Sequence, residues 1–387
     1  MKALVTGGAG FIGSHIADRL LLEGYEVRVL DNLEPRVHPK GKPSWIPKEA
    51  EFIQGDVRDQ EAMARALNRV QVVFHQTAYQ DYMSDFSKFL HVNSVSAALI
   101  HEIIVGSWQP GGIYGRAGRQ VEKVIVASSQ AVYGEGQYRC NNSSCGKHNG
   151  GVIQPETRSQ AQLQQGQWEL LCPDCGEPMD YLPLREEYQN PYNAYAISKL
   201  AEELAAVRLG RLHGIPTVAL RYSIVQGPRQ SFYNQYSGIC RIFCLRLLNN
   251  LPPLIYEDGL QKRDYTHIRD VVEANMLVLK DSRADYQVFN VGSGLEITVK
   301  KYTQALIDRL NKEIEPEVPG EYRLGDNRHS VSDIAKLKAL GWDPRHGLEE
   351  IFDDYLAWIE NQGDLGHYFR EAEQAMRAQG VVRSLKK

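Results

Sequence analysis

Short apolar runs and helical patterns alternate along the first 220 residues of the chain. Apolar runs of strand length lie at residues 2–6, 26–30, 51–53, 72–74, 123–127 and 216–220, with helical patterns at about 11–22, 59–69 and 92–105. Strands that alternate with helices of this length are typical of βαβ units, whose parallel strands form a single sheet. We therefore predict an α/β protein with a doubly wound parallel sheet.

This alternation is interrupted at about residues 136–186. The stretch is rich in Gln, Asn, Ser and Gly and holds four of the six cysteines, so we expect an inserted lobe. After Tyr222 the pattern becomes irregular, with many aromatic residues. We predict two domains: residues 1–222, which carry the sheet and the lobe, and a smaller substrate-binding domain at 223–387. Its last segment, about residues 363–387, is expected to be a charged helix.

Composition and charge exclude several classes of protein. The net charge of −4 gives no reason to expect a nucleic acid or an anionic membrane as partner. No apolar run is long enough to cross a membrane, and residues 1–6 have the pattern of a buried strand, not of a signal peptide. We therefore expect a cytoplasmic protein whose cysteines are reduced thiols or metal ligands.

Four glycines, Gly7, Gly8, Gly10 and Gly13, lie where the first apolar run passes into the first helical pattern. Glycines let the backbone turn tightly and approach a pyrophosphate, which the amides and the dipole of the helix N-terminus then bind. This context predicts a Rossmann-type dinucleotide site. The alternative is a tight turn with a purely structural role.

Asp31 ends the second predicted strand. A carboxylate at this point accepts hydrogen bonds from the adenosine ribose and repels a 2′-phosphate, which favours NAD over NADP. The alternative is a loop aspartate that caps the next turn. Asp56 and Val57 follow the third strand, where we expect the adenine to bind.

Ser129, Tyr195 and Lys199 form a candidate catalytic set. Ser129 follows the apolar run at 123–127, so it should face the crevice at the carboxyl ends of the strands. The spacing Tyr195-x-x-x-Lys199 puts a phenol and an ammonium one turn apart on one helix face. The ammonium is expected to lower the pKa of Tyr195, so that the phenol exchanges protons near neutral pH. The alternative is a tyrosine packed under a lysine stem.

These motifs resemble those of the extended short-chain dehydrogenase/reductases, and more narrowly of the NAD-dependent nucleotide-sugar epimerases and dehydratases. The similarity covers about residues 1–360 apart from the lobe, and it is carried by residues 6–13, Asp31, Ser129, Tyr195-x-x-x-Lys199 and Arg263-Asp-Tyr-Thr-His-Ile268. It implies that Tyr195 is the acid/base on a sugar hydroxyl, that Lys199 binds the nicotinamide ribose and that Ser129 hydrogen-bonds the reacting oxygen. It also implies a homodimer, formed through the helices near 92–105 and 195–212.

The resemblance further assigns contacts at both ends of the expected site. Contacts with NAD are implied for Gly7, Gly10, Phe11, Ile12, Gly13, Asp31, Asn32, Asp56, Val57, Gln76, Ala78, Tyr195 and Lys199. Contacts with a nucleotide-diphosphate sugar are implied for Tyr79, Gln80, Ser129, Gln130, Arg263 and Arg323. The two arginines suit a phosphate, although surface ion pairs are the alternative for both, and Tyr79 has the alternative of a core aromatic. Ile224 stands where the family usually has a substrate-binding Asn, so substrate contacts at that position stay open.

Gln130 and Ala131 distinguish between two reactions of this family. The related 4,6-dehydratases have an Asp-Glu pair at these positions, which serves as acid and base in the elimination of water. Neither Gln130 nor Ala131 ionises, so we predict an epimerase that oxidises the sugar transiently at C4 and returns the hydride to the opposite face. The segment 77–82 and the cysteine-rich lobe resemble dTDP-L-rhamnose 4-epimerases, which form dTDP-6-deoxy-L-talose. A dehydratase, or another enzyme that modifies nucleotide sugars, is the alternative.

Four cysteines of the lobe form two pairs, each followed by a glycine: Cys140, Cys145, Cys172 and Cys175. Four thiolates at such spacing suit a tetrahedral structural Zn²⁺. A polar lobe buries little apolar surface, and a metal would order it. The alternative is four loop thiols or transient disulfides. Cys240 and Cys244 are expected to be buried and without a ligand role.

Two other classes of protein are weighed against an enzyme. A protein that senses NAD without catalysis would use the same fold, although such proteins usually lack the tyrosine or the lysine. A zinc ribbon that binds nucleic acid would need clustered basic and aromatic residues, and the lobe has few basic residues.

Overall fold

Seven parallel strands form the central sheet in a computed structural model that describes residues 1–81, 84–106, 121–147, 150–231, 238–362, 377 and 382–385. In spatial order they are β13 (Val288–Val291), β9 (Thr217–Tyr222), β5 (Lys123–Ser129), β4 (Val72–His75), β1 (Lys2–Thr6), β2 (Glu26–Asp31) and β3 (Glu51–Gln54). Every neighbouring pair is parallel. The predicted doubly wound α/β sheet is confirmed, and its strand order reverses between β1 and β4.

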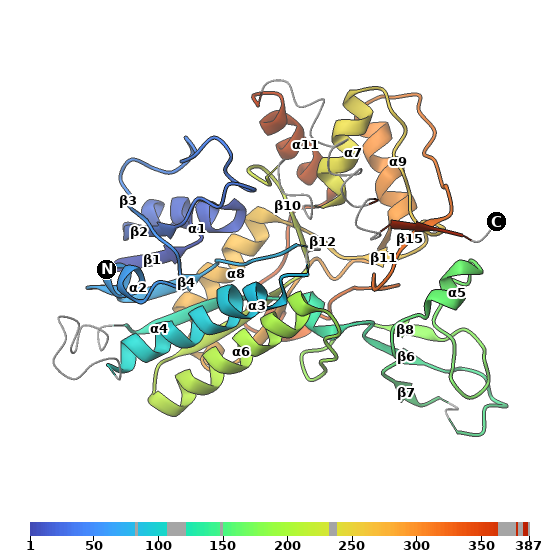
Figure 1. Ribbon diagram of the computed structural model, residues 1–387, viewed down its shortest axis with the longest axis horizontal. Helices are drawn as coiled ribbons and strands as arrows, with labels where there is room; N and C mark the ends of the chain where they lie inside the picture. Colours follow the sequence, from blue (N-terminus) through green and yellow to red (C-terminus); the bar gives the residue numbers. More distant parts are fainter. Residues whose placement is uncertain are drawn as a thin grey trace.

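Helices cover both faces of this sheet (Figure 1). One face packs against α1 (Phe11–Leu22) and α8 (Ile268–Lys280), and the other against α2 (Gln60–Leu67), α4 (Ser96–Val105) and α6 (Ala194–His213). Successive strand residues point to opposite faces of the sheet. Ala3 and Val5 belong to the core under α1 and α8, whereas Leu4 belongs to the core under α2, α4 and α6. Because both faces are covered, most positions of the inner strands are buried and apolar.

The predicted domain division at residue 222 does not separate the two parts of the chain. After this residue, α8 still covers the sheet and β13 pairs with β9 as its last strand. A third hydrophobic core, separate from the two that flank the sheet, is formed by α7 (Ile239–Leu248), α9 (Val299–Arg309) and α11 (Leu348–Ile359). The sequence analysis did not predict that the chain after residue 222 rejoins the sheet, because β13 is short and lies within an irregular stretch.

Residues 136–186 form a lobe that projects from one end of the body (Figure 1). It holds an antiparallel sheet in the order β7 (Val152–Ile153), β6 (Gln137–Arg139) and β8 (Asp180–Leu182), and the short helix α5 (Gln160–Gln164). The lobe has a small core of its own, in which Tyr138, Leu170 and Met179 pack with the cysteines.

Shorter elements connect these parts. They are α3 (Phe86–Phe89), the π-helical segment Leu90–Val95, β10 (Ile224–Gln226), β11 (Lys262–Arg263), β12 (Tyr265–His267), β14 (Ile297–Thr298), β15 (Glu321–Arg323), α10 (Ala335–Lys338), β16 (Val382–Ser384) and the 3₁₀ turns Gln130–Tyr133 and Ser282–Ala284. Most of the predicted C-terminal helix lies outside the described residues, as does Tyr82 of the segment 77–82. For Val382–Ser384 the helix prediction is wrong, because β16 pairs with β15.

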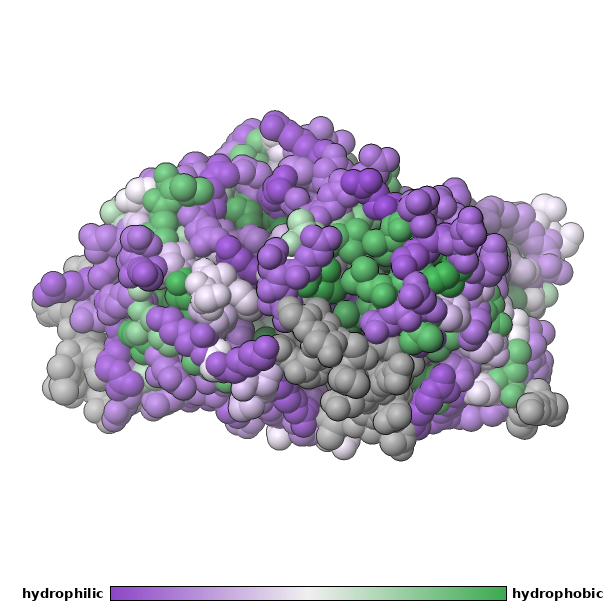
Figure 2. Space-filling model, turned by 90° about the horizontal axis from the view of Figure 1, so that it is seen from above, coloured by the Kyte–Doolittle hydropathy of each residue, from purple (hydrophilic) through white to green (hydrophobic). Residues whose placement is uncertain are grey.

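The surface in Figure 2 is largely hydrophilic, with smaller hydrophobic areas between the polar residues. Among the helices of the described ranges, none is both long and apolar enough to span a bilayer.

Glu203 and Arg221 form a buried ion pair that joins α6 to β9. The Glu203 carboxylate accepts hydrogen bonds from Arg221 Nη2 at 2.6 Å and Nε at 2.8 Å, and from the Ser128 hydroxyl of β5 at 2.8 Å. Arg221 is fully buried and Glu203 is 2% exposed. Loss of one partner would leave the other charge buried and uncompensated, which is costly.

Glu203→Gln should lower the free energy of unfolding by about 3 kcal/mol, because the buried guanidinium of Arg221 loses its counter-charge. The matched control is Glu61→Gln, which removes one half of an exposed ion pair with Arg65 and should change stability by no more than about 0.5 kcal/mol. Urea denaturation measures both variants. Equal stabilities of the two variants would contradict this account.

Candidate active site

A cavity of about 1150 Å³ opens at the carboxyl ends of the sheet strands. Its walls include the residues that directly follow β1, β2, β4 and β5, which are Gly7, Asn32, Gln76 and Gln130. Of the residues predicted to contact NAD or substrate, all except Tyr79 and Lys199 line this cavity. Residues that are far apart in the sequence thus meet at the carboxyl-end edge of the sheet, where open α/β sheets bind their ligands.

The glycine loop after β1 fits its surroundings so closely that side chains are excluded. Gly7 has a φ of +66°, and a Cβ there would lie 2.8 Å from the Thr77 nitrogen. A Cβ at Gly13 would overlap the carbonyl oxygen of Gly7. At Gly10 the single neighbour of a Cβ would be the Gly7 oxygen at 3.2 Å. Gly10 precedes α1 and lines the cavity, so a phosphate can approach the helix N-terminus there.

The polar groups around this loop fit a dinucleotide. The Asp31 carboxylate accepts hydrogen bonds from the backbone N–H of Ala9 at 3.0 Å and of Leu33 at 2.9 Å, at the cavity wall. Two buried atoms of the wall, Gln76 Nε2 and Thr77 Oγ1, have no hydrogen-bond partner among the described residues. Buried polar groups of this kind are normally satisfied, so a bound cofactor is a suitable partner for them.

Asp56 contributes a second carboxylate to the cofactor end of the cavity. A hydrogen bond from Arg58 lowers its pKa to about 2, and Asn32 Nδ2 also donates to it at 3.1 Å. Asp56 is therefore ionised over the whole physiological range and holds Asn32 in place at the wall.

Ser129 and Tyr195 meet inside the cavity. Tyr195 lies in the first turn of α6, and a hydrogen bond joins its hydroxyl to Ser129, the last residue of β5. The Ser129 hydroxyl also accepts the Ala131 N–H at 3.1 Å, which caps the 3₁₀ turn after β5. The structure thus brings together two of the three predicted catalytic side chains at the cavity wall.

Lys199 lies behind the wall and not in the cavity. Its ammonium donates to the carbonyl oxygen of Ala127 and to Glu202 Oε2, both at 2.6 Å, and its side chain is 1% exposed. Both partners of the ammonium are thus protein groups in this structure, and the contact of Lys199 with the nicotinamide ribose stays a prediction. The sequence did not indicate that Glu202, one turn further along α6, would take the ammonium.

Burial dominates the acidity of Tyr195. Burial, with a smaller contribution from the charge of Glu202, raises the pKa of Tyr195 to about 12, although the hydrogen bond from Ser129 lowers it. The expectation that Lys199 lowers this pKa is wrong for this structure, because Glu202 compensates the ammonium. Burial also raises the pKa of Glu202 to about 7. His75 lies 3.9 Å from Glu202 and is neutral, since burial lowers its pKa to about 3.

Asn93 is a positioning residue that the sequence analysis missed. It lies in the π-helical segment, where its amide donates to the Ser198 hydroxyl at 2.8 Å and to the Tyr79 carbonyl at 3.1 Å. Its side-chain oxygen accepts the Tyr79 N–H at 2.7 Å. It thereby ties the chain after β4 to the helix that carries Tyr195. The available signal was a buried amide within an otherwise apolar helical pattern, and π-helical turns often accompany functional sites.

The predicted substrate contacts divide into two groups. Gln80, Gln130, Arg263 and Arg323 line the cavity. Arg263 donates to the carbonyl oxygens of Lys262, Asn327 and Arg328, and Arg323 pairs with Asp326 at 2.8 Å. Tyr79 is instead a buried aromatic whose hydroxyl donates to Asp85 at 2.8 Å and whose ring packs edge-on against Phe89. The prediction of a substrate contact is wrong for Tyr79, and the alternative of a core aromatic holds.

The four cysteines of the lobe converge to one point. Cys140 Sγ lies 3.7 Å from Cys175 Sγ, and Cys145 Sγ lies 3.8 Å from Cys172 Sγ. All four sulfur atoms lie within 4.8 Å of one another. None of the six cysteines is in a disulfide. Cys240 and Cys244 are buried in the core formed by α7, α9 and α11.

Comparison with known proteins agrees with this geometry. A family model described as the NAD dependent epimerase/dehydratase family matches residues 3–150 and 172–292. The chain belongs to this family. Between its two matched parts the family model leaves out residues 151–171, which lie within the lobe.

Relatives of this epimerase/dehydratase cover nearly its whole length. A dTDP-L-rhamnose 4-epimerase of Burkholderia thailandensis is 31% identical over 372 residues, which are 94% of this chain and 96% of the relative. The structure of a Thermotoga maritima UDP-glucose 4-epimerase with UDP-glucose is 29% identical, has a TM-score of 0.71 and covers 94% of this chain and 100% of its own. A Thermus thermophilus UDP-glucose 4-epimerase, in complex with NAD, is 30% identical, with a TM-score of 0.67 and the same coverages. The family and these relatives support an NAD-dependent epimerase.

Glu202→Gln should shift the pH profile of this epimerase/dehydratase to lower pH. Above pH 7 Glu202 is ionised and raises the pKa of Tyr195. The amide removes that charge and leaves the Lys199 ammonium uncompensated, so both changes favour the phenolate. The rise of kcat/KM with increasing pH should therefore have a lower midpoint in the variant. A profile recorded from pH 5 to 10 tests this, with the exposed Glu313→Gln as control. An unchanged or higher midpoint would refute the role of Glu202.

Proposed function

We propose that this protein is a nucleotide-sugar 4-epimerase that uses bound NAD. The proposal is supported by the family, by the relatives that act at C4, and by a cavity that joins a glycine loop to the Ser129–Tyr195 pair. NAD, when bound, supplies a hydride acceptor and donor at the sugar carbon.

Tyr195 moves the proton in this proposal. Its phenolic oxygen, as phenolate, takes the proton of the sugar 4-hydroxyl and later returns it. The Ser129 hydroxyl holds this phenolic oxygen by a hydrogen bond. A pKa of about 12 keeps Tyr195 protonated at neutral pH. Tyr195 therefore needs an added positive charge before it ionises, and an oxidised nicotinamide carries one.

The two residues after Ser129 are the reason for proposing epimerisation and not dehydration. Gln130 and Ala131 line the cavity where the 4,6-dehydratases have an acid and a base. The side-chain oxygen of Gln130 accepts the Ser330 hydroxyl at 2.9 Å, so this amide is already engaged in a structural contact. Neither residue can take a proton from the sugar or give one to a leaving hydroxyl. Epimerisation needs only Tyr195, Ser129 and the cofactor.

The substrate that we propose to test first is dTDP-L-rhamnose, which would yield dTDP-6-deoxy-L-talose. The support is the similarity to the Burkholderia thailandensis relative over 94% of this chain. UDP-glucose is the second choice, because the related structures that bind it or are named for it have almost the same identity.

We also propose that the cysteine cluster of the lobe holds a structural Zn²⁺. A tetrahedral zinc with Zn–S distances of about 2.3 Å keeps its sulfurs about 3.8 Å apart. The separations of 3.7 and 3.8 Å within two pairs of the cluster are close to this value. Four thiolates leave no open position for a substrate, so the metal would stabilise the lobe only.

A homodimer is the proposed assembly. The helices α4 and α6 lie side by side (Figure 1), and Ser94 of the preceding π-helical segment donates to the Ser198 carbonyl at 2.8 Å. Exposed large apolar residues of these two helices and of the π-helical segment are Leu90, Val95, Val105, Ile197, Leu204 and Leu212. Apolar side chains exposed on neighbouring helices support an interface there.

A panel of nucleotide sugars, incubated with the enzyme and followed by NMR, tests the proposed function. dTDP-L-rhamnose should be converted to its C4 epimer, because the site can move a proton and a hydride at one carbon without eliminating water. Tyr195→Phe should retain NAD and lose conversion by at least about a hundredfold, whereas the exposed Tyr188→Phe should react like the parent. A 4-keto-6-deoxy product would refute the epimerase. Retained NAD without conversion of any nucleotide sugar would favour an NAD sensor.

Elemental analysis of protein purified without chelator should find about one zinc per chain. Cys175→Ser removes one of the four sulfurs at the least buried position and should abolish the zinc content. Cys244→Ser lies outside the lobe and should leave the zinc content unchanged. A parent protein free of zinc would contradict the assignment.

A further inference from the structure

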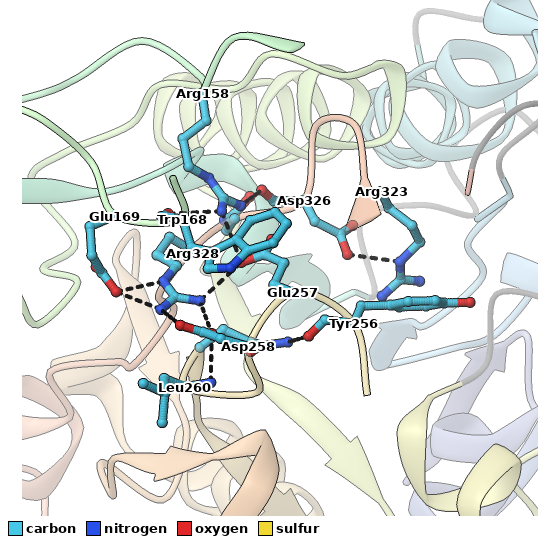
Figure 3. Close-up of polar contacts among 12 residues, drawn as sticks. Arg158, Trp168, Glu169, Tyr256, Glu257, Asp258, Leu260, Arg323, Asp326 and Arg328 are labelled. Carbon is cyan, nitrogen blue, oxygen red and sulfur yellow. Dashed lines mark hydrogen bonds and ion pairs between the residues drawn. The ribbon is translucent and has the colours of Figure 1, made fainter. Parts of the chain in front are cut away.

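Two buried arginines fasten the lobe to the C-terminal half of the chain (Figure 3). Arg158, from the lobe, donates to Glu257 Oε2 at 2.9 Å, to the Trp168 carbonyl at 3.0 Å and to the Asp326 carbonyl at 2.7 Å. Its guanidinium also lies 3.5 Å from Glu135, next to the turn that follows Ser129. Arg158 is 3% exposed, so this lobe residue is part of the interior of the protein.

Arg328 makes the reciprocal connection from the C-terminal half. It pairs with Glu169 of the lobe, and with Glu257 at 2.9 Å and Asp258 at 2.7 Å (Figure 3). Glu257 thus accepts hydrogen bonds from both arginines. Buried charges of this kind are stable only when all partners are in place, so the network fixes the lobe in one position against the body.

This position makes the lobe a wall of the cavity. The segment Thr157–Gln160, just before and at the start of α5, lines the cavity together with the loop Arg323–Asn327 and with Leu254 and Tyr256. Arg323 lies in this loop with its guanidinium 5.2 Å from the centre of the Tyr256 ring. Thr157 is half-buried at this wall.

Both ends of the segment are tied to the elements that carry Arg323. Asp326 accepts Arg158 through its carbonyl and holds Arg323 through its carboxylate at 2.8 Å. Gln160 accepts a hydrogen bond from Arg383 of β16, and β16 pairs with β15, the strand that ends at Arg323. The segment is therefore linked through Asp326 and β16 to the strand and loop that carry Arg323.

We infer that the lobe segment Thr157–Gln160 is part of the binding site for the nucleoside diphosphate half of the substrate. The inference rests on the proposed function, which places the reacting sugar at Ser129 and Tyr195, and on the expectation from the sequence that Arg323 binds a phosphate of the substrate. Thr157 contacts the ligand through its hydroxyl. Arg158 is a positioning residue that holds Arg323 through Asp326. The segment lies in the stretch 151–171 that the family model leaves out, so it would be a specificity element of this chain.

Two variants, Thr157→Val and Arg158→Lys, test this inference. The control is Ser144→Ala, at an exposed position of the lobe that does not line the cavity. Calorimetric titration of each holoenzyme with dTDP and with UDP needs neither turnover nor the correct sugar. Thr157→Val should weaken the better-bound nucleotide about fivefold, the effect of one lost hydrogen bond. Arg158→Lys keeps the buried charge but loses the donor to Asp326, so it should weaken binding on the order of tenfold. With a substrate in hand, Arg158→Lys should raise KM and leave kcat unchanged. NAD content should equal that of the parent in all three variants.

The outcomes separate this inference from the proposed function. If the parent binds neither dTDP nor UDP, the proposed function is wrong. If the parent binds one of them and both Thr157→Val and Arg158→Lys bind it equally well, the proposed function stands and the role of the lobe is refuted. A loss of affinity for the nucleotide sugar without a loss for the free nucleoside diphosphate would place the segment at the sugar and would also overturn the inference.

Discussion

The Glu203 carboxylate connects the elements on which the candidate active site depends. It accepts hydrogen bonds from Arg221 of β9 and from Ser128 of β5, while its own backbone belongs to α6. Tyr195 lies two turns before Glu203 on that helix, and Ser129 is the residue after Ser128. The hydrogen bond between Ser129 and Tyr195 thus depends on a buried ion pair that contacts neither of them, and the low dielectric of the interior makes this connection stiff.

The place of the site was predictable from the sequence, because parallel strands end at a common edge of the sheet. Gly7, Asp31 and Ser129 all stand at strand ends, and all line one cavity. The direction of individual side chains was not predictable. Tyr79 follows β4 like its cavity-lining neighbours, but Asn93 holds its backbone from both sides and its ring lies in the core. Such an arrangement depends on packing partners that are distant in sequence.

The electrostatics of the Tyr195–Lys199 pair show a similar limit. Spacing alone puts the ammonium one turn from the phenol and predicts an acidic tyrosine. The sequence also contains Glu202 one turn beyond Lys199, but whether it faces solvent or the ammonium depends on the tertiary burial of α6. In the structure it is fully buried against Lys199, and desolvation then controls the pKa of Tyr195. In the proposed function, the positive charge of the oxidised nicotinamide would lower this pKa and thereby favour the phenolate.

An insertion of this size between Ser129 and Tyr195 is compatible with catalysis because its two ends are fastened together below the lobe. The backbone N–H of Asn190 donates to the Val132 carbonyl at 2.9 Å, and the backbone of Gly134 packs so closely on Asn190 that a Cβ would overlap its carbonyl oxygen. The distance between the two catalytic side chains is thus set by this closure and by α6, not by the length of the lobe. Loops that leave and return at one point cost little when lengthened. A lobe added there can take on substrate contacts of its own while the proton-transfer geometry stays the same.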